Sequence, residues 1–471
     1  MNGDPSRPRE LRIRPPADVD ATAIASTSPA SHRARPAPPP QTDRSHRRAD
    51  AARADAPRKA ARVTTVVHPG DSLTRRQRLV YVIVLGALTA LGPFTVDLYL
   101  PAFPAIEAEL DVSTATIQLT LTATMIGFAL GQLLVGPWSD KVGRRLPLIV
   151  ATTVHVAASI GVVLAPDITW LMVARVLQGA GAAAGAVVAM ATVRDLFGGY
   201  PLVRMLSRLA LVNGLAPIAA PIIGSQLLLV TEWRGLFVFL AIYGVVIVLA
   251  SWLFIVETLP PARRVDPGHS TIGQRYRSLF GDRIFVGVAL VGGFTFSGLF
   301  VYLSASSFLF QGVYGLDAQG YGLLFAINSV GVVAGVQIAS RLAKFVGPQW
   351  ILGVSTAVLV LSATAIVVLD SAGAGLLGTI VPLWFFITAC GFGFPCVQVL
   401  ALANHGKEAG TAASLLGALN FGLAGTLSPI VGLFGITNSV PMGAMMAVCG
   451  ALAVVSLWAV VRPWTVPPLS R

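Results

Sequence analysis

From residue 79 onward, apolar residues occur in long blocks that are separated by short polar connections. A helix needs about 20 mostly apolar residues to cross the hydrocarbon core of a bilayer. Only 12% of the residues are charged, whereas about a quarter would be charged in a soluble domain. The pattern therefore predicts an all-α polytopic membrane protein with twelve transmembrane helices. The predicted spans are 79–101, 114–137, 146–165, 169–191, 203–230, 234–255, 285–312, 319–340, 349–369, 376–398, 409–434 and 439–461.

Residues 1–78 differ from the rest, because they are rich in Pro, Ala, Ser and Arg and contain no aromatic residue. They hold 16 of the 34 Lys and Arg residues and 8 of the 22 acids, a net charge of +8 out of +12. Such a segment cannot bury enough apolar surface to offset its ordering entropy. We predict a disordered cytoplasmic tail that binds no nucleic acid. Contact with anionic lipid headgroups and a merely solvated extension both stay open.

The connections between the predicted helices alternate in charge. One set, together with both chain ends, is basic: Arg75, Arg76, Lys141, Arg144, Arg145, Arg194, Arg204, Arg208, Arg263, Arg264, Arg275, Arg277, Arg283, Arg341, Lys344, Lys407 and Arg462. The other set carries Glu107, Glu109, Asp111, Asp167, Asp317 and Asp370, with Arg234 as its one basic residue. Positive charge stays on the cytoplasmic side, so both termini are predicted to be cytoplasmic.

The longest internal connection, 256–284, divides the chain into six helices at 79–255 and six at 285–462, followed by a short tail at 463–471. The two halves resemble each other. "GLAPIAAPIIG" (214–224) matches "GLAGTLSPIVG" (422–432) at six of eleven positions, and Gly127, Gly131 and Gly143 recur 204 residues later as Gly331, Gly335 and Gly347. Matches in the same order and orientation predict two parallel six-helix repeats related by an axis along the membrane normal.

Four stretches carry a more specific signal: "VDLYLPAFPAI" (96–106), "GPWSDKVGRRLPL" (136–148), "RVLQGAGAA" with "ATVRDLF" (175–183 and 191–197), and "NGLAPIAAPIIG" (213–224). Through them the chain resembles the major facilitator superfamily over residues 79–461. Within it, the chain is similar to the twelve-helix drug:proton antiporters of the bicyclomycin/chloramphenicol-resistance branch. The resemblance implies an inner-membrane transporter that works by alternating access, and not an enzyme.

The loop "GPWSDKVGRR" places an acid among bases at the predicted cytoplasmic face. Its candidate gate residues are Asp140, Lys141, Gly143, Arg144 and Arg145. Asp140 can accept hydrogen bonds from helix N-termini across the interface of the halves, and Arg144 can form a forked pair. The alternative is that these charges only set the topology.

The fifth predicted helix contains the antiporter-like motif Asn213, Gly214, Pro217, Pro221 and Gly224. Proline removes backbone hydrogen bonds and glycine permits close helix contact, so we expect a bent, tightly packed helix, although ordinary helix packing is an alternative. "GAGAAAG" (179–185) lies inside a membrane helix with no strand before it. It is therefore not read as a nucleotide loop, and an ion gradient is the expected energy source.

Asp97 is an acid within the first apolar block, where a charge costs about 2.5–3.5 kcal/mol even on insertion scales. A helical rise of 1.5 Å places Asp97 roughly 28 Å from Arg78, in the outer half of the membrane, at a depth similar to Arg175. Two roles are open. Asp97 forms a permanent ion pair with Arg175, or it carries a proton or reads substrate charge with Arg175 as its electrostatic partner. His155 is a weaker relay candidate than a packing histidine.

The remaining cavity candidates combine aromatic faces with neutral polar groups: Phe94, Gln118, Tyr302, Gln311, Asn328, Phe392 and Asn420, with Phe294 and Phe296 beside them. They favour a bulky amphipathic substrate. We predict a monomeric proton-coupled multidrug efflux antiporter with no cofactor and no metal, and with Cys390, Cys396 and Cys449 as free buried thiols. Transport of a native metabolite and a non-transporting receptor are the alternatives.

Overall fold

A computed structural model of the chain describes residues 69–261, 272–403, 405 and 409–467. Residues up to 68 of the predicted tail, Arg263 and Arg264 of the long connection, Lys407, and residues 468–471 lie outside the described residues. The prediction of a disordered tail up to residue 78 is wrong for residues 69–78, because Pro69–Ser72 forms a turn of 3-10 helix and the first long helix begins at Arg75, capped by Thr74. Within the described part, twelve helices are long and apolar enough to cross a membrane. The predicted all-α architecture with twelve spans is therefore confirmed.

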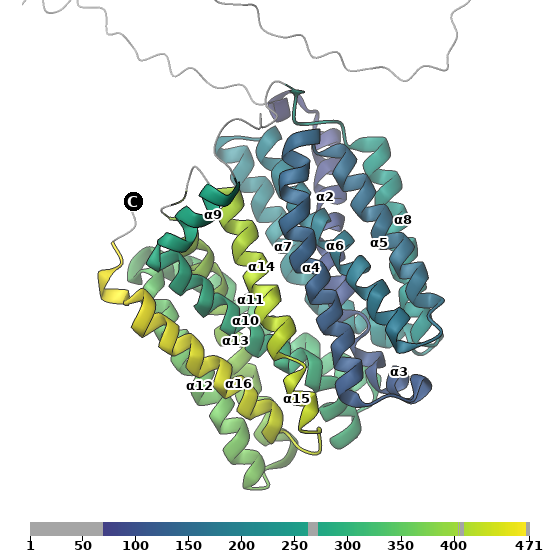
Figure 1. Cartoon of the computed structure of the whole chain (residues 1–471), viewed down its shortest axis with the longest axis vertical. Coiled ribbons are helices and arrows are strands. Elements are labelled where there is room, and N and C mark those ends of the chain that lie inside the picture. Colours follow the sequence, from purple (N-terminus) through teal and green to yellow (C-terminus); the bar gives the residue numbers. More distant parts are fainter. Residues whose placement is uncertain (1–68, 262–271, 404, 406–408, 468–471) are drawn as a thin grey trace, which may run out of the picture. The chain divides into compact units, whose positions relative to one another are not determined.

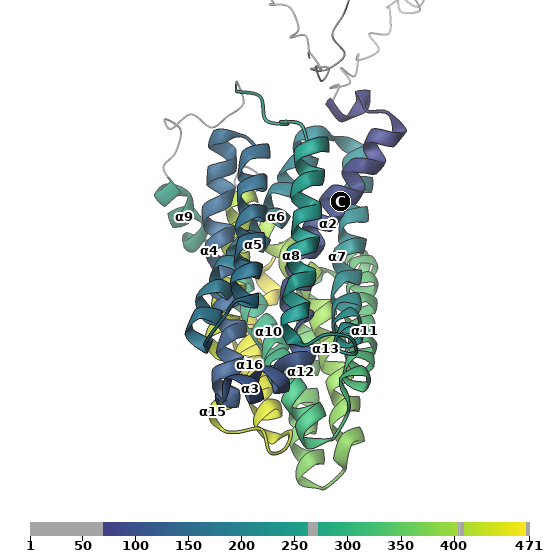
Figure 2. The same ribbon diagram turned by 90° about the vertical axis from the view of Figure 1, so that its right-hand side faces the viewer.

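The N-terminal half consists of α2 (Arg75–Asp97), α4 (Thr114–Val142), α5 (Arg145–Val163), α6 (Ile168–Leu196), α7 (Gly199–Leu227) and α8 (Trp233–Phe254). The C-terminal half consists of α10 (Arg283–Ser307), α11 (Ala318–Val346), α12 (Pro348–Ser371), α13 (Gly375–Leu402), α14 (Ala409–Leu427) and α16 (Val440–Val455). The short helices α9 (Ile272–Gly281) and α15 (Ile430–Leu433) also belong to the C-terminal side of the chain. Figures 1 and 2 show the two halves as neighbouring bundles, the first in purple to teal and the second in green to yellow.

Polar residues at the ends of the helices explain where several of them begin. Asp167 accepts a hydrogen bond from the Trp170 amide at the start of α6, and Asp317 accepts one from the Gly320 amide at the start of α11. A side-chain acceptor at this position satisfies an amide that the helix itself leaves unpaired. Two acids that the sequence assigned to one face of the membrane therefore also cap helices.

The repeated glycines occupy equivalent contacts in the two halves. A Cβ atom on Gly131 of α4 would overlap the backbone of α6 at Ala180, and one on Gly335 of α11 would overlap the backbone of α13 at Thr388. Gly179, from the glycine-rich stretch, packs in the same way against the Thr124 carbonyl. The absence of side chains lets these helices cross closely, which supports the predicted repeat and assigns the glycine-rich stretch to packing.

The predicted first span, 79–101, lies within one apolar helical segment, Arg75–Leu110. Within this segment α2 ends at Asp97, and a turn of 3-10 helix, η2 (Leu100–Ala102), leads into α3 (Phe103–Leu110). Pro101 has no N–H to donate to the Asp97 carbonyl, so the helix cannot continue. The eleventh span is interrupted in the same way between α14 and α15, where Pro429 follows Ser428.

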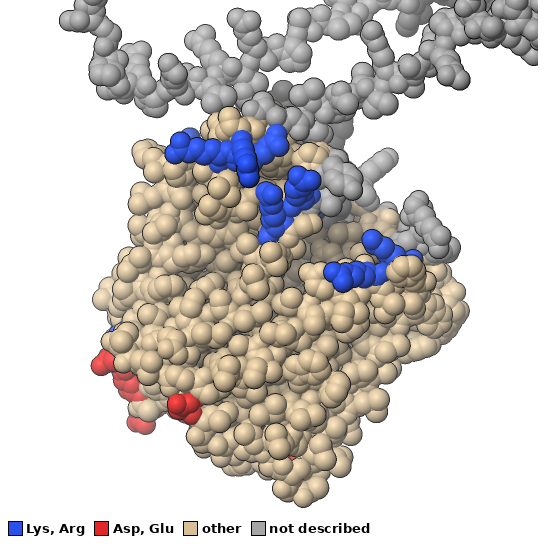
Figure 3. Space-filling model, turned by 180° about the vertical axis from the view of Figure 1, so that it is seen from behind, with Lys and Arg blue, Asp and Glu red and all other residues tan. Residues whose placement is uncertain are grey.

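The two ends of the bundle differ in charge. Figure 3 shows Lys and Arg gathered at one end and Asp and Glu at the other. We call these the basic end, which contains the loop 140–145, and the acidic end, which contains the loops at Asp111, Asp167, Asp317 and Asp370. The halves pack against each other through α4 with α14 and through α7 with α11.

Candidate functional site

Asp97 is the last residue of α2 and lies between the two halves. Its side chain is buried, with 5% of the residue exposed. Among the described residues, no hydrogen bond and no ion pair reaches its carboxyl group. It stands at the C-terminal end of a helix, where the helix dipole disfavours negative charge. A buried acid in this setting has no local group that neutralises it.

Arg175 of α6 does not pair with Asp97 in this structure. Its guanidinium donates to the Thr95 carbonyl at 3.0 Å and to Oε1 of Gln178 at 2.6 Å, and it stacks 4.0 Å from the Tyr99 ring centre. The permanent ion pair considered from the sequence is therefore absent from this conformation. The physical reason is that Arg175 binds a main-chain carbonyl at the C-terminal end of α2, where a cation stabilises carbonyls that lack a helical partner.

The polar contacts continue from Arg175 into α5. Gln178 donates to the Ser159 hydroxyl at 2.8 Å, and the two nitrogens of the His155 ring lie 3.3 Å from the Ser159 hydroxyl and 3.1 Å from the Thr95 hydroxyl. All of these side chains are fully buried. His155 is thus a hydrogen-bonded packing residue that holds α5 against α2 and α6. Sequence reasoning missed Thr95 and Gln178, although Gln178 follows Arg175 by three positions in the quoted motif.

The turn η2, which begins three residues after Asp97, packs against α10 and α11 of the C-terminal half. These helices carry Tyr302 and Tyr321, respectively. The Tyr302 hydroxyl accepts a hydrogen bond from the Asn328 amide at 3.1 Å, and the Tyr321 hydroxyl lies 2.8 Å from the Ser306 hydroxyl. Tyr302 and Asn328 were predicted as cavity residues, whereas Tyr321 was missed.

Two other predicted cavity residues connect the halves at the acidic end. Gln118 of α4 donates to the Ser304 carbonyl at 3.1 Å, and Gln311 donates to the Pro101 carbonyl at 3.0 Å. Gln319 adds a third such bond, to the Ser225 carbonyl at 3.2 Å. Within the described residues, every hydrogen bond between the halves lies at this end. The structure is closed there, and Figure 3 shows the surface recessed between the basic groups at the other end.

The other cavity candidates have separate environments. Phe94 packs on Phe239 and Tyr243 within the N-terminal half, with ring centres 6.4 and 5.5 Å away. Phe392 is half-buried in the C-terminal half. Asn420 is also half-buried, and its Oδ1 atom has no hydrogen-bond partner. These residues do not join Asp97 in one cluster.

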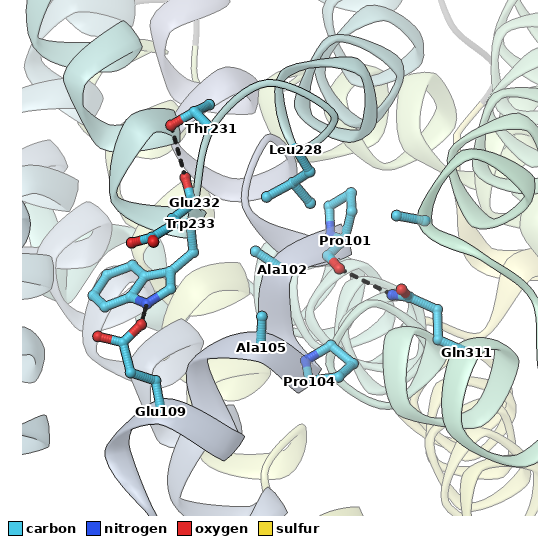
Figure 4. Close-up of a pocket in the computed structure, with 11 residues that line it drawn as sticks. Pro101, Ala102, Pro104, Ala105, Glu109, Leu228, Thr231, Glu232, Trp233 and Gln311 are labelled. Atoms are coloured by element: carbon cyan, nitrogen blue, oxygen red, sulfur yellow. Dashed lines mark hydrogen bonds between the residues drawn. The ribbon is translucent and has the colours of Figure 1, made fainter.

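A small cavity opens beside the acidic-end contacts, with a volume of about 490 Å³. Figure 4 shows residues from both halves around it, including Gln311 with its bond to Pro101. Trp233 lines the opposite wall and donates from its indole nitrogen to Glu109 at 2.6 Å. Glu109 also pairs with Arg234, so the one base on this face neutralises an acid there.

The antiporter-like motif in α7 has mixed surroundings. α7 runs continuously through Pro217 and Pro221. A Cβ atom on Gly224 would overlap the Leu98 carbonyl, and one on Gly214 would come within 3.7 Å of Val333 in the other half. Asn213 is exposed. Gly224 therefore lets α7 approach the chain directly after Asp97.

At the basic end, Arg144 is the centre of a charged cluster within the N-terminal half. It pairs with Asp140 at 2.5 Å and with Asp195 at 2.8 Å, and it donates to the Ser139 hydroxyl at 2.9 Å. Burial opposes the charge on Arg144, but the hydrogen bonds to Asp195 and Asp140 outweigh it and hold the pKa of the guanidinium above its usual value. Arg144 therefore bridges two carboxylates with one bond to each, and does not form the predicted forked pair with a single carboxylate. Sequence reasoning missed Asp195 as a partner.

Glu257, just after α8, was also missed. Its carboxylate accepts hydrogen bonds from the Arg144 and Arg145 amides, and Arg145 donates to the Trp252 carbonyl at 2.6 Å. Gly143 has φ +105°, and a Cβ atom there would overlap the Glu257 carboxylate. Lys141 is exposed. Asp140 was expected to reach across the interface of the halves, but among the described residues it binds Arg144 beside it.

Among the described residues, no group of three or more His, Cys, Asp or Glu side chains is placed to hold a metal ion. The three cysteines are free and buried, as predicted.

Twelve membrane-crossing helices in two related halves, with a polar site buried between them, define a multi-pass membrane transporter. The chain matches the Major Facilitator Superfamily over residues 84–429. It belongs to that superfamily, as the motifs indicated.

The chain is similar to several known transporters. It is 36% identical to the uncharacterized MFS-type transporter YdgK of Bacillus subtilis, over 81% of this chain and 96% of the relative. It is 28% identical to a bicyclomycin resistance protein homolog of Haemophilus influenzae, over 82% of this chain and 96% of the relative. The crystal structure of a D-xylose-proton symporter has the same fold, with a TM-score of 0.68 and 15% identity, over 82% of this chain and 98% of the symporter.

Proposed function

We propose that the protein is a proton-coupled efflux antiporter that exports amphipathic, drug-like molecules by alternating access. The observation that carries this proposal is Asp97, a buried carboxyl group at the interface of the halves that has no hydrogen-bond or ionic partner among the described residues. The basic end faces the cytoplasm in this proposal, because positive loops are retained there. The protein then acts as a monomer in the cytoplasmic membrane, with both termini inside.

The role of Asp97 follows from its surroundings. A carboxyl group without a fixed partner can take up and release a proton as its contacts and its access to water change. One proton that moves through about 150 mV supplies roughly 3.5 kcal/mol, which supports a gradient of a few hundredfold for a neutral substrate. Arg175 acts through α2, since it binds the Thr95 carbonyl and not the carboxyl group.

The substrate class follows from the neutral and aromatic groups near the interface. Tyr302, Phe325 and Tyr321 form a row of rings in the C-terminal half, with neighbouring ring centres 5.8 and 6.2 Å apart. Aromatic surface binds flat apolar molecules in several orientations because its contacts are large and not strongly directional. The relative named for bicyclomycin resistance supports an antibiotic-like substrate.

The cluster around Arg144 is proposed as part of the cytoplasmic gate. In this conformation it fixes the loop 140–145 inside the N-terminal half. In the opposite conformation, the exposed side of Asp140, whose side chain is 46% accessible, becomes available to the other half. The tail and the long connection are proposed as cytoplasmic segments that do not form the transport path.

The test is transport into vesicles of a host that lacks its own major efflux pumps. A fluorescent amphipathic dye or a phenicol antibiotic is added outside inverted vesicles that are energised with a proton gradient. Uptake into vesicles with the protein is compared with uptake into vesicles without it. Uptake that requires the protein and collapses on addition of a protonophore is the expected result. If uptake is the same with and without the protein for every compound of a chemically broad panel, drug export is contradicted.

Two alternatives remain distinguishable from drug efflux. Proton-coupled movement of a native metabolite would give protein-dependent flux with cell extracts but not with drugs. A receptor that does not transport would give no protein-dependent flux with any substrate.

A further inference from the structure

The first and last spans of the C-terminal half bring two arginines together at the basic end. The first of these spans begins at Arg283, and the last ends at Thr465, three residues after Arg462. The Arg283 guanidinium donates to the Thr465 hydroxyl at 3.0 Å, and that hydroxyl donates to the Arg462 carbonyl at 2.8 Å. Figure 1 shows the yellow end of the chain at the same end of this half as α9. Residues at the ends of spans lie at the level of the lipid headgroups, so both arginines are placed at a membrane surface.

The backbone fixes the position of Arg462. The last span continues from α16 into a stretch of π-helix, η6 (Ser456–Val461), and Arg462 ends it with φ +56°, a conformation that residues with a side chain rarely adopt. The Thr465 amide binds the Arg462 carbonyl and stabilises this turn. A Cβ atom on Gly287 of α10 would overlap the Val461 side chain. The turn at Arg462 is therefore packed closely against the beginning of α10.

The two guanidinium groups keep unused donors. Arg462 uses only its Nε atom, on the Ala459 carbonyl at 3.3 Å, and Arg283 uses only one terminal nitrogen, on the Thr465 hydroxyl. Both arginines are exposed. Neither has an ion-pair partner among the described residues. Each guanidinium can therefore still bind an anion.

No described acid of this half is available to them. Asp282 precedes Arg283, but its carboxylate already binds the His405 ring at 3.0 Å and the Ile284 amide at 2.8 Å. Asp317 and Asp370, the other described acids between residues 272 and 467, lie at the acidic end. The anion that suits the two arginines must therefore come from outside the described chain.

Two exposed tryptophans adjoin the arginines. Trp458 and Trp464 are 42% and 60% exposed, and their ring centres lie 6.0 Å apart. No hydrogen bond reaches either indole nitrogen from the part of the chain that the structure describes. Tryptophan is favoured at membrane surfaces, because its ring is apolar and its N–H group is polar. The pair offers apolar surface and two further donors next to the guanidinium groups.

We propose that Arg283, Arg462, Thr465, Trp458 and Trp464 form a site for the headgroup of one anionic phospholipid. The unused polar groups of the arginines and tryptophans are all donors, whereas a phosphate offers acceptors and forms short, charge-assisted bonds with guanidinium. A zwitterionic headgroup would bring its own cation toward two arginines, so the site selects an anionic lipid. The tryptophan rings contact the glycerol and acyl carbons, which a free phosphate lacks. The bound lipid joins the first and last spans of the C-terminal half.

The test measures lipid binding by the full chain. Dioleoyl phosphatidylglycerol is titrated into protein in mixed micelles of detergent and dioleoyl phosphatidylcholine, and bound lipid is counted by native mass spectrometry. The wild type is expected to retain one phosphatidylglycerol in preference to phosphatidylcholine. The double variant Arg283→Gln with Arg462→Gln should bind it about thirtyfold more weakly, since each arginine beside an anionic headgroup contributes about fivefold.

The matched control is Arg341→Gln with Lys344→Gln. It removes two positive charges from exposed positions on α11, at the same end of the same half. Its affinity for phosphatidylglycerol should stay within about twofold of the wild type, because salt screens charges that do not touch the headgroup.

A second measurement locates the lipid. Phosphatidylglycerol with brominated acyl chains quenches the tryptophans that it touches, and it should quench the wild type more than brominated phosphatidylcholine does. Trp458→Phe with Trp464→Phe keeps two apolar rings and should abolish this excess. Trp252→Phe with Trp350→Phe is the control, because both tryptophans are exposed near the basic end, and it should leave the excess in place.

Equal loss of affinity in the two charge variants would overturn the proposal, since the basic end would then attract anionic lipid only diffusely. Equal binding of the two lipids, or excess quenching that survives Trp458→Phe with Trp464→Phe, would also overturn it. Displacement by inorganic phosphate at matched ionic strength would mean that the site binds a free anion and not a lipid. If the double arginine variant fails to fold, Arg462→Gln alone decides, because this side chain contacts only the Ala459 carbonyl, and an unchanged affinity contradicts the proposal.

Discussion

At the basic end, Arg144 pairs with Asp140 and Asp195 inside one half, whereas at the acidic end glutamine amides of one half donate to main-chain carbonyls of the other. Charged contacts hold a loop within a rigid unit. Neutral contacts hold together two units that must separate. A neutral hydrogen bond contributes only about 0.5–1.5 kcal/mol net, so a few of them can close an interface without locking it.

The two repeats share the geometry of one turn but differ in the charged contacts around it. Gly143 and Gly347 both have positive φ, at +105° and +85°, between equivalent helices. The N-terminal turn continues into Arg144, while the C-terminal turn continues into Pro348, which begins α12. The turn geometry is thus kept in both halves, but the charged cluster belongs to one. The repeat supplies the scaffold, and the differences between its copies supply the chemistry.

The largest expected effect comes from Asp97→Asn, which removes a buried acid that has no hydrogen-bond or ionic partner among the described residues. The amide has nearly the same shape, so expression and folding should stay near wild type. Accumulation of substrate should fall from a few hundredfold to about onefold, because the proton's roughly 3.5 kcal/mol is no longer coupled. The measurement is the steady-state substrate ratio in energised vesicles.

The control for this substitution is Asp167→Asn, which makes the same chemical change at the N-cap of α6. Asparagine caps helices as well as aspartate does, so transport should be retained. Active export by the Asp97→Asn protein at wild-type levels would remove Asp97 from the mechanism and make the acidic-end interface purely structural.

The sequence predicted the helices well and the site only partly. Apolar blocks, charge alternation and the glycine repeat each follow from local physics, so the span count and the two repeats were predictable. The depth of Asp97 and Arg175 followed from helical rise, but rise does not determine the direction in which a side chain faces. Asp195 and Glu257 contact Arg144 from 51 and 113 positions away, and no spacing rule connects them.

The next largest effect is expected for Arg144→Ala. The substitution leaves the Asp195 carboxylate, whose side chain is 18% accessible, without its cation. Breaking a partly buried pair on one side should cost about 2 kcal/mol, seen as a lower thermal unfolding temperature, and transport should fall by about tenfold or more. The double variant Arg144→Ala with Asp195→Ala should recover part of the stability. A double variant as unstable as the single one would contradict the pairing.

A smaller effect is expected for Gln311→Leu at the acidic end. It removes one of the hydrogen bonds between the halves, worth about 1 kcal/mol, so the ratio of closed to open conformations should fall by about fivefold. Spin-label distances across the acidic end measure this ratio directly. Gln226→Leu is the control, because Gln226 is exposed at the same end. Equal ratios for the two variants would mean that the bond to Pro101 does not hold the interface.

The smallest effect is expected for Lys141→Gln, which removes a positive charge from the same loop as Arg144→Ala. Lys141 is exposed, and no hydrogen bond or ion pair from its side chain reaches another described residue. Exposed charges contribute at most about 1 kcal/mol. The unfolding temperature should therefore stay near that of the wild type, and the transport rate should stay within about twofold of it. The comparison with Arg144→Ala separates a gate that depends on the contacts of Arg144 from a loop whose positive charges only set the topology. If both variants lose transport equally while their topology is intact, total positive charge matters more than the contacts of Arg144, and the charged cluster would not be the feature that distinguishes the basic end.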